Sequence, residues 1–303
     1  STALFAGVSK GAYEVRKFLS PNRVNRIILL SDGLANQGPS SPGELGALGR
    51  SLASDGITVS TIGLGLDYNE DLMTQLAMNS DGNHMFAETP QDVTEAFARE
   101  LGDVLSVVAQ DVSISFNCAA GIRPVRVLGR EAEISGQRVR LSMNQLYNEQ
   151  TKFVILEVEV PSTSVGAEMV VGDAQISYSN MHTHTNETQK FTVSVVGTES
   201  PEAVEQHVNK NIMASVIHMQ AVANNERALE LKDAGQVEAA KKVLSDNVYF
   251  LNSNAITLES EKLQEYGLSN DAQIQQFDED ADAFKKSRKG IKEEQHKLKT
   301  QQE

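Results

Sequence analysis

The 303 residues are enough for two or three domains, and a hydrophobic content of 40% supplies real cores, which excludes a globally disordered chain. A formal net charge of −14 argues against nucleic acid as a partner, because phosphate binding needs a basic face. No apolar run approaches the roughly 20 residues that a membrane-spanning helix requires, so we expect no membrane span in this chain.

The first third of the chain alternates between amphipathic helices and apolar strands. Ser1-Thr2 begins a predicted helix that ends at Ser20-Pro21, with an apolar face made of Leu4, Phe5, Val8, Ala12, Val15 and Leu19. The elements that follow are a buried strand at Arg26–Ser31, a helix near Glu44–Ser54, a buried strand Ile57–Ile62, a helix ending at Ser80-Asp81-Gly82, a short strand around His84–Phe86 and a long helix to about Val107. This order predicts a doubly wound parallel sheet.

The first predicted strand runs directly into Asp32-Gly33. In open α/β sheets, ligands bind just past the C-terminal ends of such strands, so Asp32 is a candidate for a metal or anion site. The loop 34–42 that follows is rich in turn-forming residues, as binding loops often are. The alternative interpretation of Asp32 is a cap for the next helix.

Four blocks of sequence, in this order, resemble the second half of a von Willebrand factor type A domain: Ser1–Leu4, Ile27–Gly33, Thr61–Met73 and Asp81–His84. The resemblance covers about residues 1–108. It implies a metal-ion-dependent adhesion site made from three loops, which carry an Asp-x-Ser-x-Ser motif, a Thr, and an Asp followed by Gly. Thr2 matches the second element and Asp32 the third, whereas the first element and the three strands expected before Thr2 are absent from this sequence.

The resemblance also implies the chemistry of that site. The expected ion is Mg²⁺, with Mn²⁺ or Ca²⁺ as alternatives, and Mg²⁺ takes six oxygens in an octahedral array. Thr2 would contribute its hydroxyl directly or through water, and Asp32 would act mostly through water. An acidic side chain of a partner protein would fill the open position. We expect weak Mg²⁺ binding by this chain alone, and the alternative interpretation of Thr2 is a plain helix cap.

In the usual strand order of such sheets, 3-2-1-4-5-6, the first strand lies beside the fourth. Arg26–Ser31 would be that fourth strand, so the absence of the earlier strands leaves a flat, apolar edge, and such an edge invites aggregation. We therefore expect the sequence to be a fragment of a longer protein. A natural N-terminus with a reduced fold is the alternative.

Residues 109–199 change to period-two patterning, which predicts an antiparallel sheet or small sandwich. The side chains expected to face inward are Val112, Ile114, Phe116, Val125, Val127, Phe153, Ile155, Val158, Val160, Phe191, Val193 and Val195. The polar segment Tyr178–Gln189 is predicted as a loop, and its His182-Thr183-His184 lacks a nearby third metal ligand. Cys118, the only cysteine, is expected to be a buried thiol without special chemistry.

Residues 200–303 are predicted to be helical, with Ser200-Pro201 as a helix start. An apolar stripe over Val204, Val208, Ile212, Val216 and Met219 favours one continuous helix. A turn at Asp233-Ala234-Gly235 leads into a second helix, so the pair resembles one tetratricopeptide-type hairpin. The tail places an acidic run, 278–282, before a basic one, 285–299, and predicts a solvated or frayed helix, with a contact to an acidic partner as the alternative.

The sequence contains no phosphate-binding loop, dinucleotide fingerprint, nucleophile elbow or haloacid-type Asp pair, so we expect no enzyme. The predicted function is a divalent-metal-dependent, adhesion-type protein-binding module of an exported bacterial protein. Two alternatives remain: an envelope scaffold with a degenerate metal site, or an adaptor for a chaperone ATPase or metal-insertion complex. The resemblance places the protein at the cell surface or in the periplasm.

Overall fold

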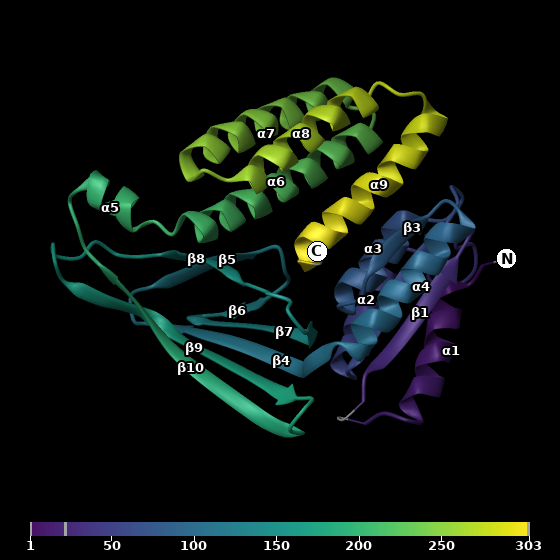
Figure 1. The fold of residues 1–303 in the computed structure, drawn as a ribbon, viewed down its shortest axis with the longest axis horizontal. Helices are drawn as coiled ribbons and strands as arrows, with labels where there is room; N and C mark the ends of the chain where they lie inside the picture. The colour runs from purple at the N-terminus through teal and green to yellow at the C-terminus, as the bar shows by residue number, and fades with distance from the viewer. Residues whose placement is uncertain (1, 21–22, 302–303) are drawn as a thin grey trace.

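The computed structural model describes residues 2–20 and 23–301. Ser1 and Pro21, which the sequence places at the two ends of the first helix, lie outside the described residues. The chain forms an α/β part, an antiparallel β part and a helical part, and its last helix returns to pack against the first part (Figure 1). Across the described residues, no helix is long and apolar enough to cross a membrane.

The α/β part confirms the predicted parallel sheet. Its strands are β1 (Asn25–Ser31), β2 (Ile57–Leu64) and β3 (His84–Ala87), in spatial order β1-β2-β3. Helices α1 (Leu4–Arg16), α2 (Pro42–Ser54) and α3 (Glu70–Asn79) share one core with β1 and β2, whereas α4 (Pro90–Leu105) packs on the opposite face. The apolar runs in the strands follow from this burial on both faces.

Local signals fix several helix boundaries. Ser41 and Glu44 form a reciprocal capping box at the start of α2, with Pro42 as the first helical residue. Thr89 and Asp92 do the same for α4. The first helix is shorter than predicted: α1 ends at Arg16, so Leu19 lies beyond the helix and is exposed.

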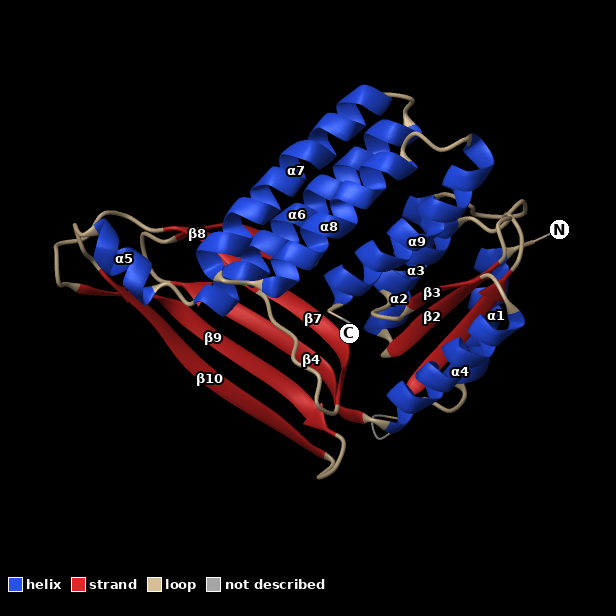
Figure 2. Cartoon of the chain, turned by 45° about the horizontal axis from the view of Figure 1, so that its top comes forward, coloured by secondary structure: helices blue, strands red, loops and turns tan. Residues whose placement is uncertain are grey.

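The β part contains two antiparallel sheets (Figure 2). One has the order β10-β9-β4-β7-β6, and the other pairs β5 with β8. The strand bounds are β4 (Val107–Cys118), β5 (Arg123–Leu128), β6 (Glu133–Ser135), β7 (Arg138–Tyr147), β8 (Ile155–Glu159), β9 (Glu168–Asn180) and β10 (Thr185–Val196). Cys118 is buried as expected, and burial raises the pKa of its thiol.

Two predictions for the β part are wrong. The segment Tyr178–Gln189 is a strand hairpin rather than a loop, with His182 and His184 in its tight turn. The side chains of Phe191, Val193 and Val195 are exposed by 50%, 42% and 40% rather than facing a core, and Val160, just beyond the end of β8, is exposed by 42%. Period two shows that one face of β10 is apolar, but it cannot show whether a second layer covers that face at the sheet edge.

The helical part contains α5 (Pro201–His207), α6 (Lys210–Asp233), α7 (Val237–Leu258), α8 (Glu261–Gln276) and α9 (Ala281–Thr300). The predicted hairpin is α6–α7, and α8 adds a third helix to it (Figure 1). The predicted continuous helix is interrupted at Val208, where ψ is 124°, because Asn209 caps the start of α6. Val204 and Ile212 are consequently exposed rather than part of one stripe.

The basic tail is not frayed, and only its first turns are exposed to solvent. It forms α9, which packs against α3 and β3 of the α/β part (Figure 1). The prediction of a solvated helix is wrong for the rest of α9, because acidic residues from distant segments pair with it, such as Glu70 with Lys289 and Asp233 with Arg288.

A buried arginine on β1 links the α/β part to the β part. The Arg26 guanidinium on β1 donates to Glu100 Oε2 of α4 at 2.9 Å and to Gln145 Oε1 of β7 at 2.7 Å. The side chains of Arg26 and Glu100 are 4% and 0% exposed. The ion pair with Glu100 keeps the Arg26 charge compensated within the α/β part, and the hydrogen bond to Gln145 connects this buried group to the β part.

Candidate functional site

The C-terminal end of β1 places Asp32 at the edge of the parallel sheet. The strand ends at the buried Ser31, and Asp32 follows on an exposed turn. The Ser31 hydroxyl donates to the Gly33 carbonyl at 3.1 Å, which tightens this turn. Asp32 does not cap a helix, because α2 begins ten residues later and its cap is Ser41.

Thr2 is held against the same turn. Its backbone amide donates to Asn36 Oδ1 at 2.8 Å, and the Asn36 amide donates back to the Thr2 carbonyl at 3.0 Å. A β-carbon added to Gly33 would lie 3.4 Å from Thr2 Oγ1. The fold therefore brings Thr2 to the turn that carries Asp32. Sequence reasoning missed Asn36, although an Asn in the loop after a binding strand is a visible signal.

The oxygen atoms of Thr2 and Asp32 could supply part of the coordination shell of a magnesium ion. Helix α1 begins at Leu4, and no side chain caps it, so the Thr2 hydroxyl is not used as a helix cap. Within ranges 2–20 and 23–301, neither the Thr2 hydroxyl nor the Asp32 carboxylate has a hydrogen-bond or ion-pair partner. In the same ranges no group of three His, Cys, Asp or Glu residues could hold a metal. Two hard oxygen donors fit Mg²⁺ chemically, but they fill only a minority of six positions.

Helix α9 covers the neighbouring loops of this sheet edge. Lys285 pairs at 2.8 Å with Asp67 in the loop after β2, and Lys286 pairs at 2.7 Å with Glu88 after β3. Further along the helix, the Glu293 carboxylate accepts from the Phe86 amide at 3.0 Å. The loops beyond β2 and β3 are therefore occupied by α9, whereas the turn beyond β1 stays open.

A buried cluster of charges anchors α9. Lys289 is 0% exposed; its Nζ donates to Glu70 Oε2 at 2.6 Å and to the Tyr68 carbonyl at 3.0 Å, and it lies 3.9 Å from the centroid of the Tyr68 ring. Arg288 reaches Glu70, Asp71 and Asp233. Burial acts to raise the pKa of Glu70, but the hydrogen bond and charge of Lys289 outweigh it, so the Glu70 pKa is lowered.

Two buried histidines lie at the same interface. His84 Nδ1 is 2.8 Å from Thr61 Oγ1, and His296 Nε2 is 2.9 Å from the Gly82 carbonyl, which it must donate to. Their ring centroids are 6.1 Å apart. Burial lowers the pKa of His84 well below its usual value and that of His296 to about 4, so both rings are neutral at pH 7. Sequence reasoning could not find this pair, because the two residues are far apart in the chain.

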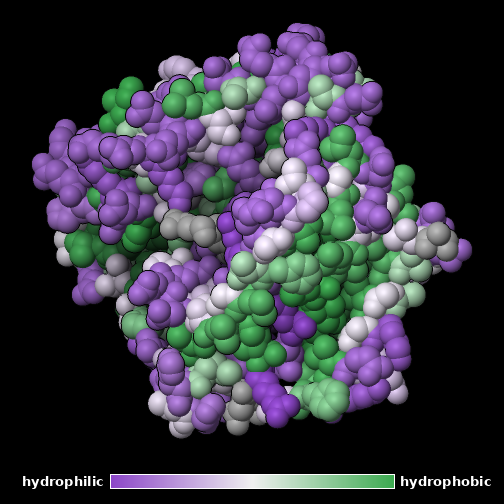
Figure 3. Space-filling model, turned by 45° about the vertical axis from the view of Figure 1, so that its right-hand side comes forward, coloured by the Kyte–Doolittle hydropathy of each residue, from purple (hydrophilic) through white to green (hydrophobic). Residues whose placement is uncertain are grey.

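The free edge of β1 is apolar. Among the described strands, β1 pairs with β2 alone. Figure 3 looks at the side of the molecule that carries this edge and shows hydrophobic surface gathered there. The exposed apolar side chains on β1 and on the helices and loop around it include Phe18, Leu30, Leu34, Leu101 and Leu105. A large exposed apolar area marks an interaction site or an aggregation liability.

Two curated proteins are similar in sequence to this chain. The uncharacterized protein YfbK of Escherichia coli is 30% identical over 129 residues, which is 42% of this chain and 22% of that protein. An uncharacterized protein of Synechocystis, sll0103, is 23% identical over 189 residues, which is 59% of this chain and 44% of that protein. The chain thus matches less than half the length of either relative. No protein-family model matches it.

Solved structures are similar in fold. A von Willebrand factor type A protein from Catenulispora acidiphila matches with a TM-score of 0.70 and 16% identity, over 93% of this chain and 65% of that one. The ArnB paralog VWA2 from Sulfolobus acidocaldarius matches with a TM-score of 0.52 and 17% identity, over 95% and 66%. The human COPII-coat protein Sec24c matches with a TM-score of 0.58 and 13% identity, over 96% and 43%. At these identities the likeness concerns the fold.

Proposed function

We propose that this chain, which has a von Willebrand factor type A fold, is a non-enzymatic protein-binding module whose recognition surface is the open turn beyond β1. The observation that carries the proposal is the placement of Thr2 against the Ser31–Gly33 turn, at the edge of the sheet where α/β proteins bind ligands. The neighbouring turns are occupied by α9, so this part of the edge is the one open to a partner.

Thr2 and Asp32 would contribute to a Mg²⁺ site. The Thr2 hydroxyl is a hard oxygen donor held in place by its own backbone bonds to Asn36. The Asp32 carboxylate is exposed, so it supplies negative charge at the turn and can bind through water. Mn²⁺ and Ca²⁺ prefer similar oxygen ligands. The remaining protein ligands would come from a segment beside the free edge of β1.

The partner in this proposal is a protein that presents an acidic side chain to the ion. A carboxylate is the natural sixth ligand for a Mg²⁺ that keeps open positions. The proposal extends to compartment: by the resemblance in sequence blocks, the full protein works at the cell surface or in the periplasm. Fractionating cells that express the full-length gene, and detecting the protein with an antibody, tests the compartment directly.

Metal titration followed by NMR tests the metal site. Mn²⁺ should first broaden the amide signals of Thr2, Gly33 and Asn36, with a dissociation constant on the order of 10⁻³ M or weaker because the chain offers only two ligands. Adding acetyl-Gly-Glu-Gly-amide should tighten Mg²⁺ binding, whereas the Gln form of that peptide should have no effect. The double variant Thr2→Val with Asp32→Asn should lose the selective broadening.

Asp111→Asn is the matched control, because Asp111 lies on β4, in the region next to Gly56 at the other end of β2. This variant should keep the Mn²⁺ response of the wild-type chain. Tight Mg²⁺ binding by the unmodified chain, or broadening that is unchanged in the double variant, would contradict the assignment of Thr2 and Asp32.

A further inference from the structure

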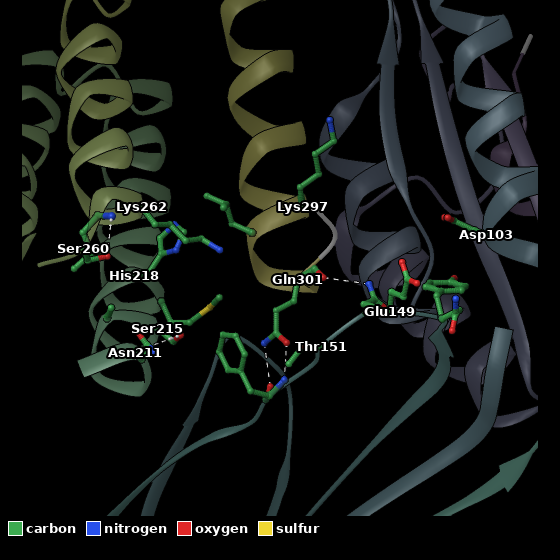
Figure 4. A pocket seen from close by; sticks show the side chains of 18 of the residues that line it. Asp103, Glu149, Thr151, Asn211, Ser215, His218, Ser260, Lys262, Lys297 and Gln301 are labelled. Atoms are coloured by element: carbon green, nitrogen blue, oxygen red, sulfur yellow. Dashed lines mark hydrogen bonds between the residues drawn. The ribbon is translucent and has the colours of Figure 1, made fainter. Parts of the chain in front are cut away.

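A cavity of about 630 Å³ lies where the three parts of the chain meet. Helices α6 and α8 form one wall, the connection between β7 and β8 forms another, and the ends of α4 and α9 complete it (Figure 4). This volume falls within the range of sites for small ligands and short peptide segments.

The wall made by the helical part carries hydrogen-bond donors and no acid. Its polar residues are Asn211, Ser215, His218, Ser260 and Lys262. The end of α9 adds Lys297 and Gln301, and again no acid. Acidic side chains line the cavity only from the other side, at Asp103 and Glu149. In a chain with a net charge of −14, an acid-free wall of donors indicates a place for a negatively charged group.

His218 is the buried polar residue of this wall. It is 5% exposed, and its ring packs on the Tyr266 ring with centroids 4.7 Å apart. Its Nε2 is buried without a hydrogen-bond partner in the described chain. Burial lowers the His218 pKa to about 4, and the nearby Lys262 charge acts in the same direction. An unpaired buried nitrogen is costly, so a ligand that supplies a partner would gain from it.

The same cavity has an apolar part. Met219, Leu263 and Leu298 line it beside the donors, and Phe153 lines it from the β part. The position of Phe153 is fixed, because the Gln301 side-chain amide accepts from the Phe153 amide at 2.8 Å and donates to its carbonyl at 3.0 Å (Figure 4). The cavity is therefore preformed, with a polar wall and an apolar surface in fixed positions.

We propose that this cavity binds a carboxylate that carries an apolar body, with the carboxylate against His218 and Lys262 and the body against Met219, Leu263 and Leu298. Such a group is found on a small carboxylic acid and at the C-terminus of a peptide chain. The cavity is lined by neither Thr2 nor Asp32, so the proposal does not depend on the metal site.

Binding has an electrostatic signature at His218. In the free protein, burial and the Lys262 charge disfavour the charged imidazolium. A bound carboxylate is an opposite charge within contact distance of the ring, and it favours that form. The titration midpoint of His218 should therefore move upward by about one pH unit or more when the site is saturated.

The experiment uses NMR of the full chain in the presence of EDTA, so that the metal site plays no part. The probes are N-acetyl-leucine and the tripeptide acetyl-Ala-Ala-Leu, each as the free acid and as the C-terminal amide. The acids should bind and shift the His218 ring signals. The amides should bind at least about tenfold more weakly than the acids, because charge-assisted hydrogen bonds are stronger than neutral ones. Tighter binding of the tripeptide acid than of N-acetyl-leucine assigns the site to a chain terminus, and the reverse assigns it to a small acid.

His218→Phe keeps an aromatic ring against Tyr266 and removes Nε2, so it should weaken binding of the acids by about tenfold or more. His182→Phe, in the exposed β9–β10 turn, is the matched control and should bind like the wild type. The wild-type titration of His218 tests the proposal even if His218→Phe fails to fold. Equal binding of acids and amides, or a His218 midpoint that does not rise with ligand, overturns it.

Discussion

The Glu70–Lys289 pair is the contact at which a single substitution should separate α9 from the α/β part. Glu70→Gln would leave the Lys289 ammonium buried at 0% exposure without the charge of its counter-ion, because an amide oxygen can accept its hydrogen bond but carries no negative charge. Removing one partner from a buried pair costs about 3–5 kcal/mol. Against a typical unfolding free energy of about 5–15 kcal/mol, that is a large loss.

Lys289→Met should cost less than Glu70→Gln. In Lys289→Met, Glu70 keeps its pairing with Arg288 and no charge is left alone, so the loss is about 1.5–3 kcal/mol for the hydrogen bonds to a charged group. The loss of unfolding free energy in the double variant should be smaller than the sum of the losses in the two single variants, because the two removed charges are each other's partners. Lys286→Met is the surface control: Lys286 and Glu88 are 54% and 48% exposed, and such pairs contribute about 0–1 kcal/mol.

Urea unfolding followed by circular dichroism measures these differences, and amide hydrogen exchange of α9 locates them. The Glu70 pKa is lowered in the folded chain, so its contribution is present above its unfolded pKa and is lost as pH falls through the folded value. The gap between wild type and Glu70→Gln should therefore shrink in acid. If Lys289→Met proved more damaging than Glu70→Gln, or if α9 exchange were unchanged in both, the account of this interface would be wrong.

Two further predictions concern close packing and pH. Gly82→Ala should destabilise the fold by about 1–3 kcal/mol or more, because the added β-carbon would lie 2.0 Å from the Val59 carbonyl oxygen. Gly102→Ala, in open space on α4, should instead stabilise the fold by about 0.5–1 kcal/mol. Thermal unfolding of the two variants measures the difference. The pKa of His296 falls to about 4 on folding, so the free energy of unfolding should drop by up to about 3 kcal/mol as pH falls from 6.5 to 4. In His296→Gln the free energy of unfolding should depend less on pH over this range. Urea midpoints at several pH values measure both.

The sequence alone determined the alternation of strands and helices in the first part. Segments rich in Ile, Val and Thr, such as Ile57–Ile62, are buried on both faces of a parallel sheet, and this composition is local information. The start of α5 was also readable, because Ser200 followed by Pro201 is a boundary signal contained in two residues, and the same signal at Ser41-Pro42 puts the start of α2 two residues before the predicted Glu44. The turn that carries Asp32 could be predicted in the same way, because an apolar strand followed by Asp32-Gly33 is a pattern of adjacent residues.

Only the tertiary structure decided which surfaces are covered. The alternating pattern of β10 predicted a buried face, but that face is exposed, and the basic pattern of α9 predicted a solvated helix, but Lys289 of α9 is buried. Both predictions failed because burial depends on a second element elsewhere in the chain. Lys289 and Glu70 are more than two hundred residues apart, and so are His296 and Gly82. The donor wall at His218 likewise exists only where α6, α8 and α9 meet. A residue's own neighbours in sequence encode its preferred backbone, whereas its pairing and desolvation are set by distant segments that folding brings into contact.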